Sequence, residues 1–115
     1  MRIHNLYVDE AGESHFRDIE VEWAPSDQKK QSHVMPATGV IFRRTESDHD
    51  LDWHVAPRRQ YVVNLDAGVE ITTSDGETRV LGAGEVLLVE DVTGKGHRSR
   101  AVYGQIRHSL FICIE

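Results

Sequence analysis

Short apolar segments separated by polar turns run along most of the chain, and their alternation has the two-residue period of β-strands. The clearest stretch is VEITTSDGETRVLGAGEVLLVED, where Val69–Thr73 is rich in β-branched residues and Asp75-Gly76 is a tight-turn sequence. Thr78–Leu81 predicts the returning strand, and Val86–Val89 predicts a buried strand after a Gly-Ala-Gly turn. This stretch therefore predicts consecutive hairpins.

Further segments of the same character predict more strands. They cover residues 2–8, 18–23, 38–44, 60–65 and 108–115. Residues 25–32 are polar and predict a loop, and no internal repeat is present. Short strands with glycine-containing turns predict an all-β, antiparallel sandwich or barrel, and a jelly roll is favoured because it protects sheet edges in a small chain.

Composition is that of one ordinary globular domain. The 115 residues are 39% apolar and 28% charged, enough for one core. We expect one domain over residues 1–115, with N-terminal strands and a loop in 1–37 and the main barrel in 38–115.

No segment approaches the roughly 18 apolar residues of a membrane helix, and the first residues lack the apolar core of a secretory signal. We therefore expect a cytoplasmic protein without a membrane partner. The net charge of -6 disfavours nucleic acid as a partner.

The stretch EDVTGKGHRSR, residues 90–100, contains a Gly-Lys-Gly-His sequence. It is not a phosphate loop of the Walker type, because no glycine precedes Gly94 by five residues and no Ser or Thr follows Lys95. Gly94 and Gly96 instead permit a tight loop with unusual backbone dihedrals. We expect this loop to direct His97 into the interior and to leave Lys95 and Arg98 near the rim.

A second polar group lies in DLDWHVAPRRQYVVNLDAGVEI, residues 50–71. In an extended chain the even-numbered residues share one face, although a proline interrupts the ladder here. Those residues are His54, Ala56, Gln60, Val62 and Asn64. Two inward imidazoles, from His54 and His97, with one or two oxygen donors are typical of an iron, manganese, nickel or zinc site.

With these residues in place, the chain resembles the cupin family, whose motifs are G-x5-H-x-H-x3,4-E-x6-G and G-x5-P-x-G-x2-H-x3-N. In HVAPRRQYVVNLDA, His54 takes the first histidine position, Ala56 the second, and Gln60 that of the glutamate. GEVLLVED opens the second motif at Gly84, and His97 takes its histidine position after a longer loop. The resemblance covers residues 38–115 and implies a double-stranded β-helix, or jelly-roll barrel, with its site inside.

The resemblance also implies a divalent transition metal (Fe, Mn, Ni or Zn) on His54, His97 and Gln60. Ala56 in place of a histidine and an amide in place of a carboxylate both weaken this expectation, because the amide brings no negative charge. The catalytic candidates are His97, Asp91 and Lys95. Asp91 could act as a general base or could hold its loop through ion pairs.

Substrate-binding candidates are polar or aromatic residues expected at the cavity or its rim, where an arginine fork suits a carboxylate or phosphate. They are Trp53, Arg58, Arg59, Asn64 and Arg98. Each also has a purely structural explanation, as a solvated or core side chain. For His4, His15, His49 and His108, that explanation is favoured.

Three functions remain open. The favoured one is a cupin-type enzyme that acts on a polar or anionic small molecule with a bound metal. The second is metal-free: a histidine acts as acid and base with an Asp or Tyr partner, as in the related sugar epimerases and isomerases. The third is a non-catalytic module that binds a small molecule. The resemblance further implies a homodimer formed through the sheets, for which the apolar N-terminal strand is a candidate surface.

Overall fold

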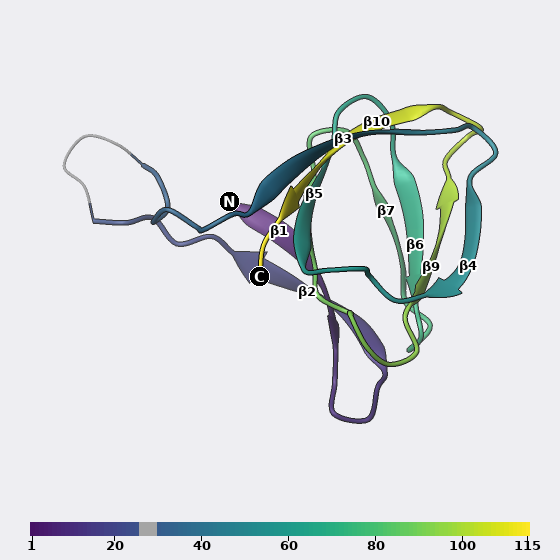
Figure 1. Cartoon of the computed structure of the whole chain (residues 1–115), viewed down its shortest axis with the longest axis horizontal. Coiled ribbons are helices and arrows are strands. Elements are labelled where there is room, and N and C mark those ends of the chain that lie inside the picture. Colours follow the sequence, from purple (N-terminus) through teal and green to yellow (C-terminus); the bar gives the residue numbers. More distant parts are fainter. Residues whose placement is uncertain (26–29) are drawn as a thin grey trace.

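The computed structural model describes residues 1–25 and 30–115, and these form ten strands in two sheets without a helix (Figure 1). The larger sheet has the order β2-β1-β8-β5-β10-β3, and the smaller has the order β4-β9-β6-β7. The strands are β1 (Arg2–Val8), β2 (Ser14–Glu20), β3 (Gly39–Thr45), β4 (Asp50–His54), β5 (Gln60–Asn64), β6 (Val69–Thr73), β7 (Thr78–Leu81), β8 (Val86–Val89), β9 (His97–Ala101) and β10 (Arg107–Cys113). The all-β prediction is confirmed.

Strand positions agree best with prediction where alternation and turn residues occur together. The predicted bounds of β1, β6, β7 and β8 are those observed, and β3, β5 and β10 differ by one or two residues at their ends. β2 begins four residues earlier than predicted, because Ser14 pairs with Val8 across the first hairpin. The predicted loop at 25–32 lies partly outside the described residues.

The strand pairs are antiparallel with one exception. β1 runs parallel to β8, with His4 opposite Leu87 and Leu6 opposite Val89. The prediction of a wholly antiparallel architecture is therefore wrong at this point, because the N-terminal strand joins the sheet beside a strand distant in sequence. In the part of the chain that the structure describes, hydrogen bonding does not close the sheets into one barrel, since β2 and β3 are edges of one sheet and β4 and β7 of the other.

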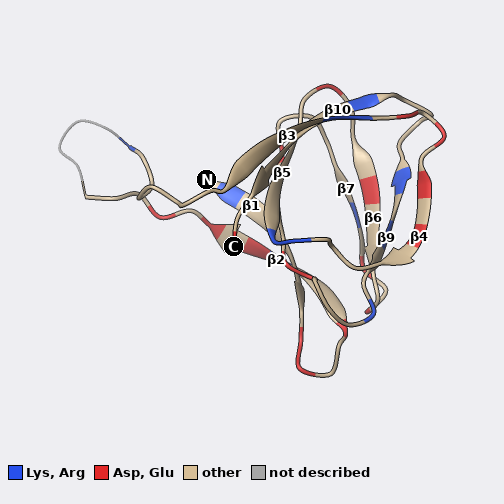
Figure 2. Cartoon of the chain, in the orientation of Figure 1, with Lys and Arg blue, Asp and Glu red and all other residues tan. Residues whose placement is uncertain are grey.

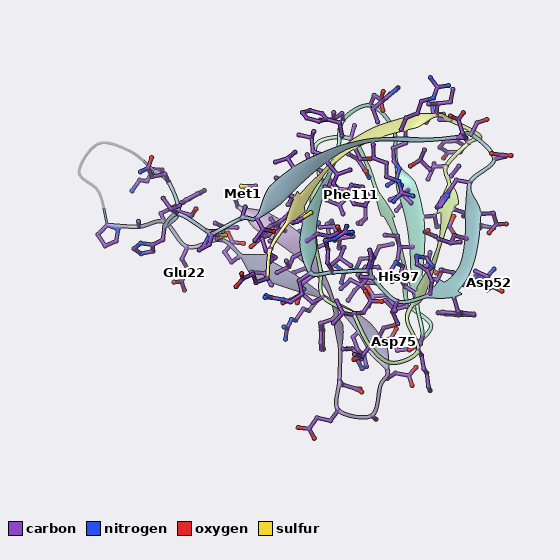
Figure 3. All side chains as sticks on the ribbon, viewed as in Figure 1. Met1, Glu22, Asp52, Asp75, His97 and Phe111 are labelled. Atoms are coloured by element: carbon purple, nitrogen blue, oxygen red, sulfur yellow. The ribbon has the colours of Figure 1, made fainter. Side chains whose placement is uncertain are left out.

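The core lies between the two sheets. β5 and β6 alternate strictly between buried and half-buried residues, as expected for strands with one face inward. Figure 3 shows side chains of both sheets filling the space between them, with Phe111 from β10 and His97 from β9. The buried apolar cluster comprises Leu6, Phe16, Ala56, Val62, Val69, Ile71, Leu81, Leu87, Val89 and Phe111. Burial of each larger member contributes about 1.5–3 kcal/mol.

The N-terminal strand is an interior strand of the large sheet. β1 is hydrogen-bonded to β2 on one side and to β8 on the other, and Leu6 is completely buried. β1 therefore has no free edge for a second copy of the chain. Between β2 and β3, the described residues 21–25 and 30–38 extend away from both sheets (Figure 1). Across residues 1–25 and 30–115, no helix is suited to crossing a membrane.

Candidate functional site

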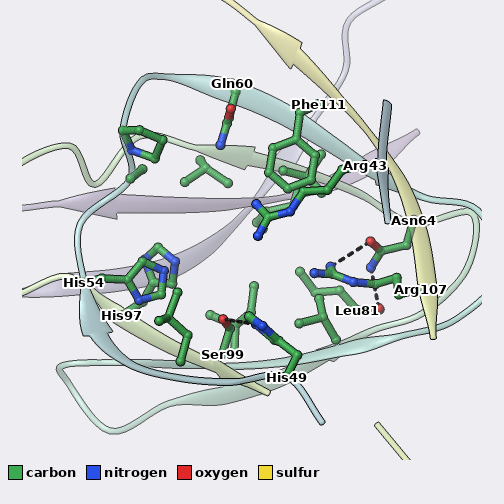
Figure 4. Close-up of a pocket in the computed structure, with 18 of the residues that line it drawn as sticks. Arg43, His49, His54, Gln60, Asn64, Leu81, His97, Ser99, Arg107 and Phe111 are labelled. Carbon is green, nitrogen blue, oxygen red and sulfur yellow. Dashed lines mark hydrogen bonds between the residues drawn. The ribbon is translucent and has the colours of Figure 1, made fainter. Parts of the chain in front are cut away.

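A cavity of about 270 Å³ lies between the two sheets and is lined by residues from both (Figure 4). All five even-numbered residues singled out between His54 and Asn64 line it. These residues share the cavity even though β4 and β5 belong to different sheets. The connection between the two strands also lies along the cavity, and its residues Ala56 and Pro57 form part of the wall. Most of the wall surface is apolar, and the polar side chains include two groups of particular interest.

The first polar group is a pair of histidines. His54 ends β4 and His97 begins β9, and the two residues are opposite each other in the strand register. Their ring centroids are 4.4 Å apart with the planes tilted by 57°. Gly96 permits this approach, because its φ is +74° and a Cβ there would lie 2.2 Å from the carbonyl oxygen of His54. The expectation that Gly94 and Gly96 bring His97 inward is confirmed, with φ of +83° at Gly94.

Each ring of this pair is held through its Nδ1 atom. His97 Nδ1 lies 2.5 Å from Oδ2 of Asp91, which is completely buried, and His54 Nδ1 lies 2.7 Å from the backbone oxygen of Asp52. A carbonyl and an ionised carboxylate only accept hydrogen bonds, so both Nδ1 atoms donate. In each neutral ring, the Nε2 atom therefore carries the lone pair. Neither Nε2 atom makes a hydrogen bond to a described residue. The other carboxylate oxygen of Asp91, Oδ1, is buried without a partner in the same part of the chain.

Gln60, the predicted third metal ligand, faces this pair from β5 in the other sheet (Figure 4). Its amide oxygen accepts a hydrogen bond from Arg58 at 3.2 Å. Among residues 1–25 and 30–115, no cluster of three His, Cys, Asp or Glu side chains could hold a metal ion. The chain thus offers two well-oriented imidazoles, but the third expected donor lies beside a positive charge.

The second polar group surrounds a buried arginine. Arg107, at the start of β10, is only 7% exposed, and its Nη1 donates to the amide oxygen of Asn64 at 3.0 Å. Asn64 also accepts from Ser109 and donates to the carbonyl of Leu81. Asn64 was predicted to bind substrate, but its hydrogen-bonding atoms are engaged in holding this arginine. The side chain of Arg43 points into the same cavity from β3 (Figure 4).

Burial and the neighbouring positive charges together lower the pKa of two side chains at this end of the cavity. Burial, together with the charge of Arg43, lowers the pKa of Arg107 to about 10. Burial also lowers the pKa of His49, and the charges of Arg107 and Arg43 lower it further. His49 lies in the cavity wall and bonds Ser99 at 2.9 Å. Arg107 remains charged at neutral pH, whereas His49 is neutral there.

Four predicted site residues lie outside the cavity. Lys95 pairs with Glu13 at 2.7 Å, and Arg59 pairs with Glu90 at 2.7 Å. Trp53 is 46% exposed, and the guanidinium of Arg98 lies 5.8 Å from its ring centroid. Of the predicted set, the cavity brings together His54, Arg58, Gln60, Asn64 and His97, with Asp91 behind His97.

Sequence analysis missed Arg43, Arg107 and the inward position of His49. The signal for Arg107 was available: residues 107, 109 and 111 share one strand face, and Phe111 is an obvious core residue. The predicted strand began at residue 108 and therefore did not include Arg107. Arg43 shares the inward face of β3 in the same way, opposite Ser109.

The solved structures that are similar to this chain include the following two. One is the conserved SPY1581 protein of unknown function from Streptococcus pyogenes, with a TM-score of 0.53 at 17% identity over 75% of this chain and 71% of that protein. The other is protein NMB1881 from Neisseria meningitidis, also with a TM-score of 0.53 at 17% identity, over 78% of this chain and 89% of that one. At this identity the likeness concerns the fold alone. No family model matches the sequence, and no curated protein is significantly similar to it.

Proposed function

We propose that this protein is a small-molecule enzyme of the cupin type, a jelly roll whose cavity uses His97 as a general acid and base. The observation that carries the proposal is the 2.5 Å contact between Nδ1 of His97, which lines the cavity, and the buried carboxylate of Asp91 behind it. A carboxylate on one ring nitrogen fixes the tautomer and stabilises the protonated ring, as required of a histidine that transfers protons.

The chemistry suited to this pair is the removal and return of a proton on carbon. Nε2 of His97 takes a proton from a carbon next to a carbonyl group of the substrate, and the resulting imidazolium is stabilised by Asp91. The proton on the imidazolium exchanges with solvent, and return of a solvent-derived proton to the same carbon gives hydrogen exchange. Return to the opposite face of that carbon gives epimerisation, and return to a neighbouring carbon gives isomerisation. Such catalysis contributes typically 10²–10⁴-fold, and the apolar wall strengthens the electrostatic interaction by excluding water.

Hydrogen exchange tests this role without a known product. The protein is incubated in D₂O with 2-oxo acids, hydroxyketones and sugars, and loss of the C–H signal is followed by ¹H NMR. We expect catalysed exchange of at least one class, no catalysis by His97→Gln, and a decrease of about 10²-fold or more in Asp91→Asn. Lys95→Gln, outside the cavity, is the matched control. Saturable binding with no exchange in any class would favour the non-catalytic module instead.

A divalent metal is the second candidate, because one observation favours it. Metal-bound histidines usually donate their other ring N–H to a carboxylate or a backbone carbonyl, and His97 and His54 both do so. Both Nε2 atoms would hold the ion, which would supply Lewis-acid or oxygen-activating chemistry. The remaining donor fits poorly, because the oxygen of Gln60 accepts from the guanidinium of Arg58.

Elemental analysis and one variant separate the two candidates. Near-stoichiometric iron, manganese, nickel or zinc in the untagged protein, lost in a His54→Ala and His97→Ala double variant, would support the metal. His54→Gln removes one of two imidazole ligands but leaves the Asp91–His97 pair intact. Exchange that survives in His54→Gln supports acid–base catalysis, and exchange lost together with the metal supports the metal site.

We further propose a homodimer formed through the outer face of the large sheet. Phe42, which is 83% exposed, lies opposite Leu110, which in turn lies opposite Val63, and this row ends at Val86. Such a contiguous apolar row on a sheet face is typical of a protein–protein contact. The cytoplasmic location and the absence of a nucleic-acid or membrane partner remain predictions.

A further inference from the structure

Arg107 is a buried cation without a counter-charge. Within residues 1–25 and 30–115, its guanidinium bonds only neutral oxygens, those of Asn64 at 3.0 Å and Thr45 at 3.5 Å, and no carboxylate lies within ion-pair distance. Buried charges are normally paired, because taking an ion out of water without a partner is costly. The side chain is nevertheless held in place from two strands, and it lines the cavity.

A second arginine increases the positive charge at this end of the cavity. Arg43 and Arg107 come from the adjacent strands β3 and β10, whose basic segments lie side by side in Figure 2. The guanidinium of Arg43 lies 5.1 Å from the ring centroid of Phe111, and it too makes no ion pair with a described residue. The one carboxylate in the cavity wall, Glu85, is bonded to His4 and to the backbone N–H of Gly82.

We propose that Arg107 and Arg43 form the binding site for the carboxylate of a small organic acid, with the remainder of the molecule extending along the apolar wall toward His97. Two of the five N–H donors of Arg107 are used by Asn64 and Thr45, so three remain for a ligand. A planar guanidinium binds a carboxylate through two parallel hydrogen bonds. The inference rests on the proposed function only in placing the reacting carbon near His97.

The cavity favours a carboxylate over a phosphate group, and a small molecule over a large one. A phosphate dianion is usually surrounded by several backbone N–H groups or by a helix N-terminus, and the described residues contain no helix. The volume of about 270 Å³ is near the lower end of the roughly 300–1,000 Å³ of pockets for drug-sized ligands. Leu81, Leu87 and Phe111 supply apolar contact for the body of the acid.

Binding of matched acids and amides tests the inference. The probes are benzoate and 3-methylbutanoate, their neutral counterparts benzamide and 3-methylbutanamide, and inorganic phosphate. Binding is measured by NMR through the arginine Nε–H signals and the ring signals of His49. We expect both carboxylates to bind saturably and shift the Arg107 signal, and the amides to bind at least tenfold more weakly.

The variants separate the two arginines from general effects of charge. Arg43→Gln should weaken carboxylate binding about tenfold, the effect of one charge-assisted hydrogen-bonded contact of roughly 1.4 kcal/mol. Arg44 is the neighbour of Arg43 and pairs with Glu46, so Arg44→Gln is the control and should leave binding unchanged. If Arg107→Gln is unstable, Arg107→Lys offers a folded alternative. His97→Gln should retain binding while losing exchange, so failure of the proposed catalysis and failure of this site are distinguishable. Equal binding of acid and amide, an unaffected Arg43→Gln, or binding of phosphate alone would overturn the assignment.

Discussion

Replacing Gly96 by alanine perturbs the contact that brings His97 to the cavity. Gly96 has φ of +74°, and an added Cβ would lie 2.2 Å from the carbonyl oxygen of His54, 2.4 Å from its carbon and 2.9 Å from the backbone nitrogen of Val55. All three contacts are with backbone atoms. Relief of the overlap therefore requires the β4 and β9 strands to separate where the two histidines meet.

The expected loss of stability has two parts, and another glycine isolates the first. A left-handed backbone costs an alanine about 1–2 kcal/mol. Gly84 has φ of +83° with nothing within 4 Å of its added Cβ, so Gly84→Ala should lose that amount alone. Gly96→Ala adds the strain of moving backbone, which we place at about 2 kcal/mol more, by analogy with overpacked sites. A total of about 3–4 kcal/mol would be a large part of the stability of a domain of this size.

Denaturant unfolding measures both variants on one scale. The free energies of unfolding of wild type, Gly84→Ala and Gly96→Ala are compared at a common slope with denaturant concentration. The NMR ring signals of His54 and His97 show whether the pair separates. If Gly96→Ala loses no more stability than Gly84→Ala and leaves these signals unchanged, the close approach at this loop is not the constraint described above.

Three other predictions concern stability and assembly. Asn64→Ala removes one of the two partners of the Arg107 guanidinium and the amide's hydrogen bonds with Ser109 and Leu81, so the unfolding free energy should fall by about 3 kcal/mol; a loss under about 1 kcal/mol would show that the network is dispensable. The lowered pKa of His49 means that the unfolded chain binds this proton more readily, so stability should fall as pH drops below about 6.5. Arg43→Gln should reduce that fall, and His49→Asn should remove it, as followed by denaturation at several pH values. Phe42→Glu should lower the apparent mass in light scattering, and a wild-type monomer would contradict the proposed dimer.

Local patterns predicted most strands but not the joining of the chain ends to the sheets. β6, β7 and β8 were found because β-branched alternation and a Gly-containing turn occur together. The parallel pairing of β1 with β8 was not found, because it joins residues more than 80 positions apart and no local signal specifies it. His54 and Gln60 lie on different sheets because the chain leaves β4 at His54 and enters β5 at Gln60, with a proline between them that cannot continue a ladder.

For the candidate site, alternation predicted which residues face inward better than residue chemistry did. The even-numbered positions from His54 to Asn64 all line the cavity. Arg58, Arg59 and Arg98 were expected at the rim, and no arginine was expected in the interior, where charged residues are rarely found. Arg107 is an exception, because it is buried in a network of neutral hydrogen bonds.

The neutrality of that network is itself an argument about function. A carboxylate in place of Asn64 would hold Arg107 more tightly, but it would also cancel the charge of the arginine. Gln60 likewise accepts from Arg58 without neutralising it. If the interior served stability alone, apolar residues of similar volume would do as well or better than a buried cation. The side-chain amides of Asn64 and Gln60 hold their arginines in position and leave the positive charge available. This charge attracts an anionic ligand, and it repels a divalent cation that enters the cavity without an accompanying anion.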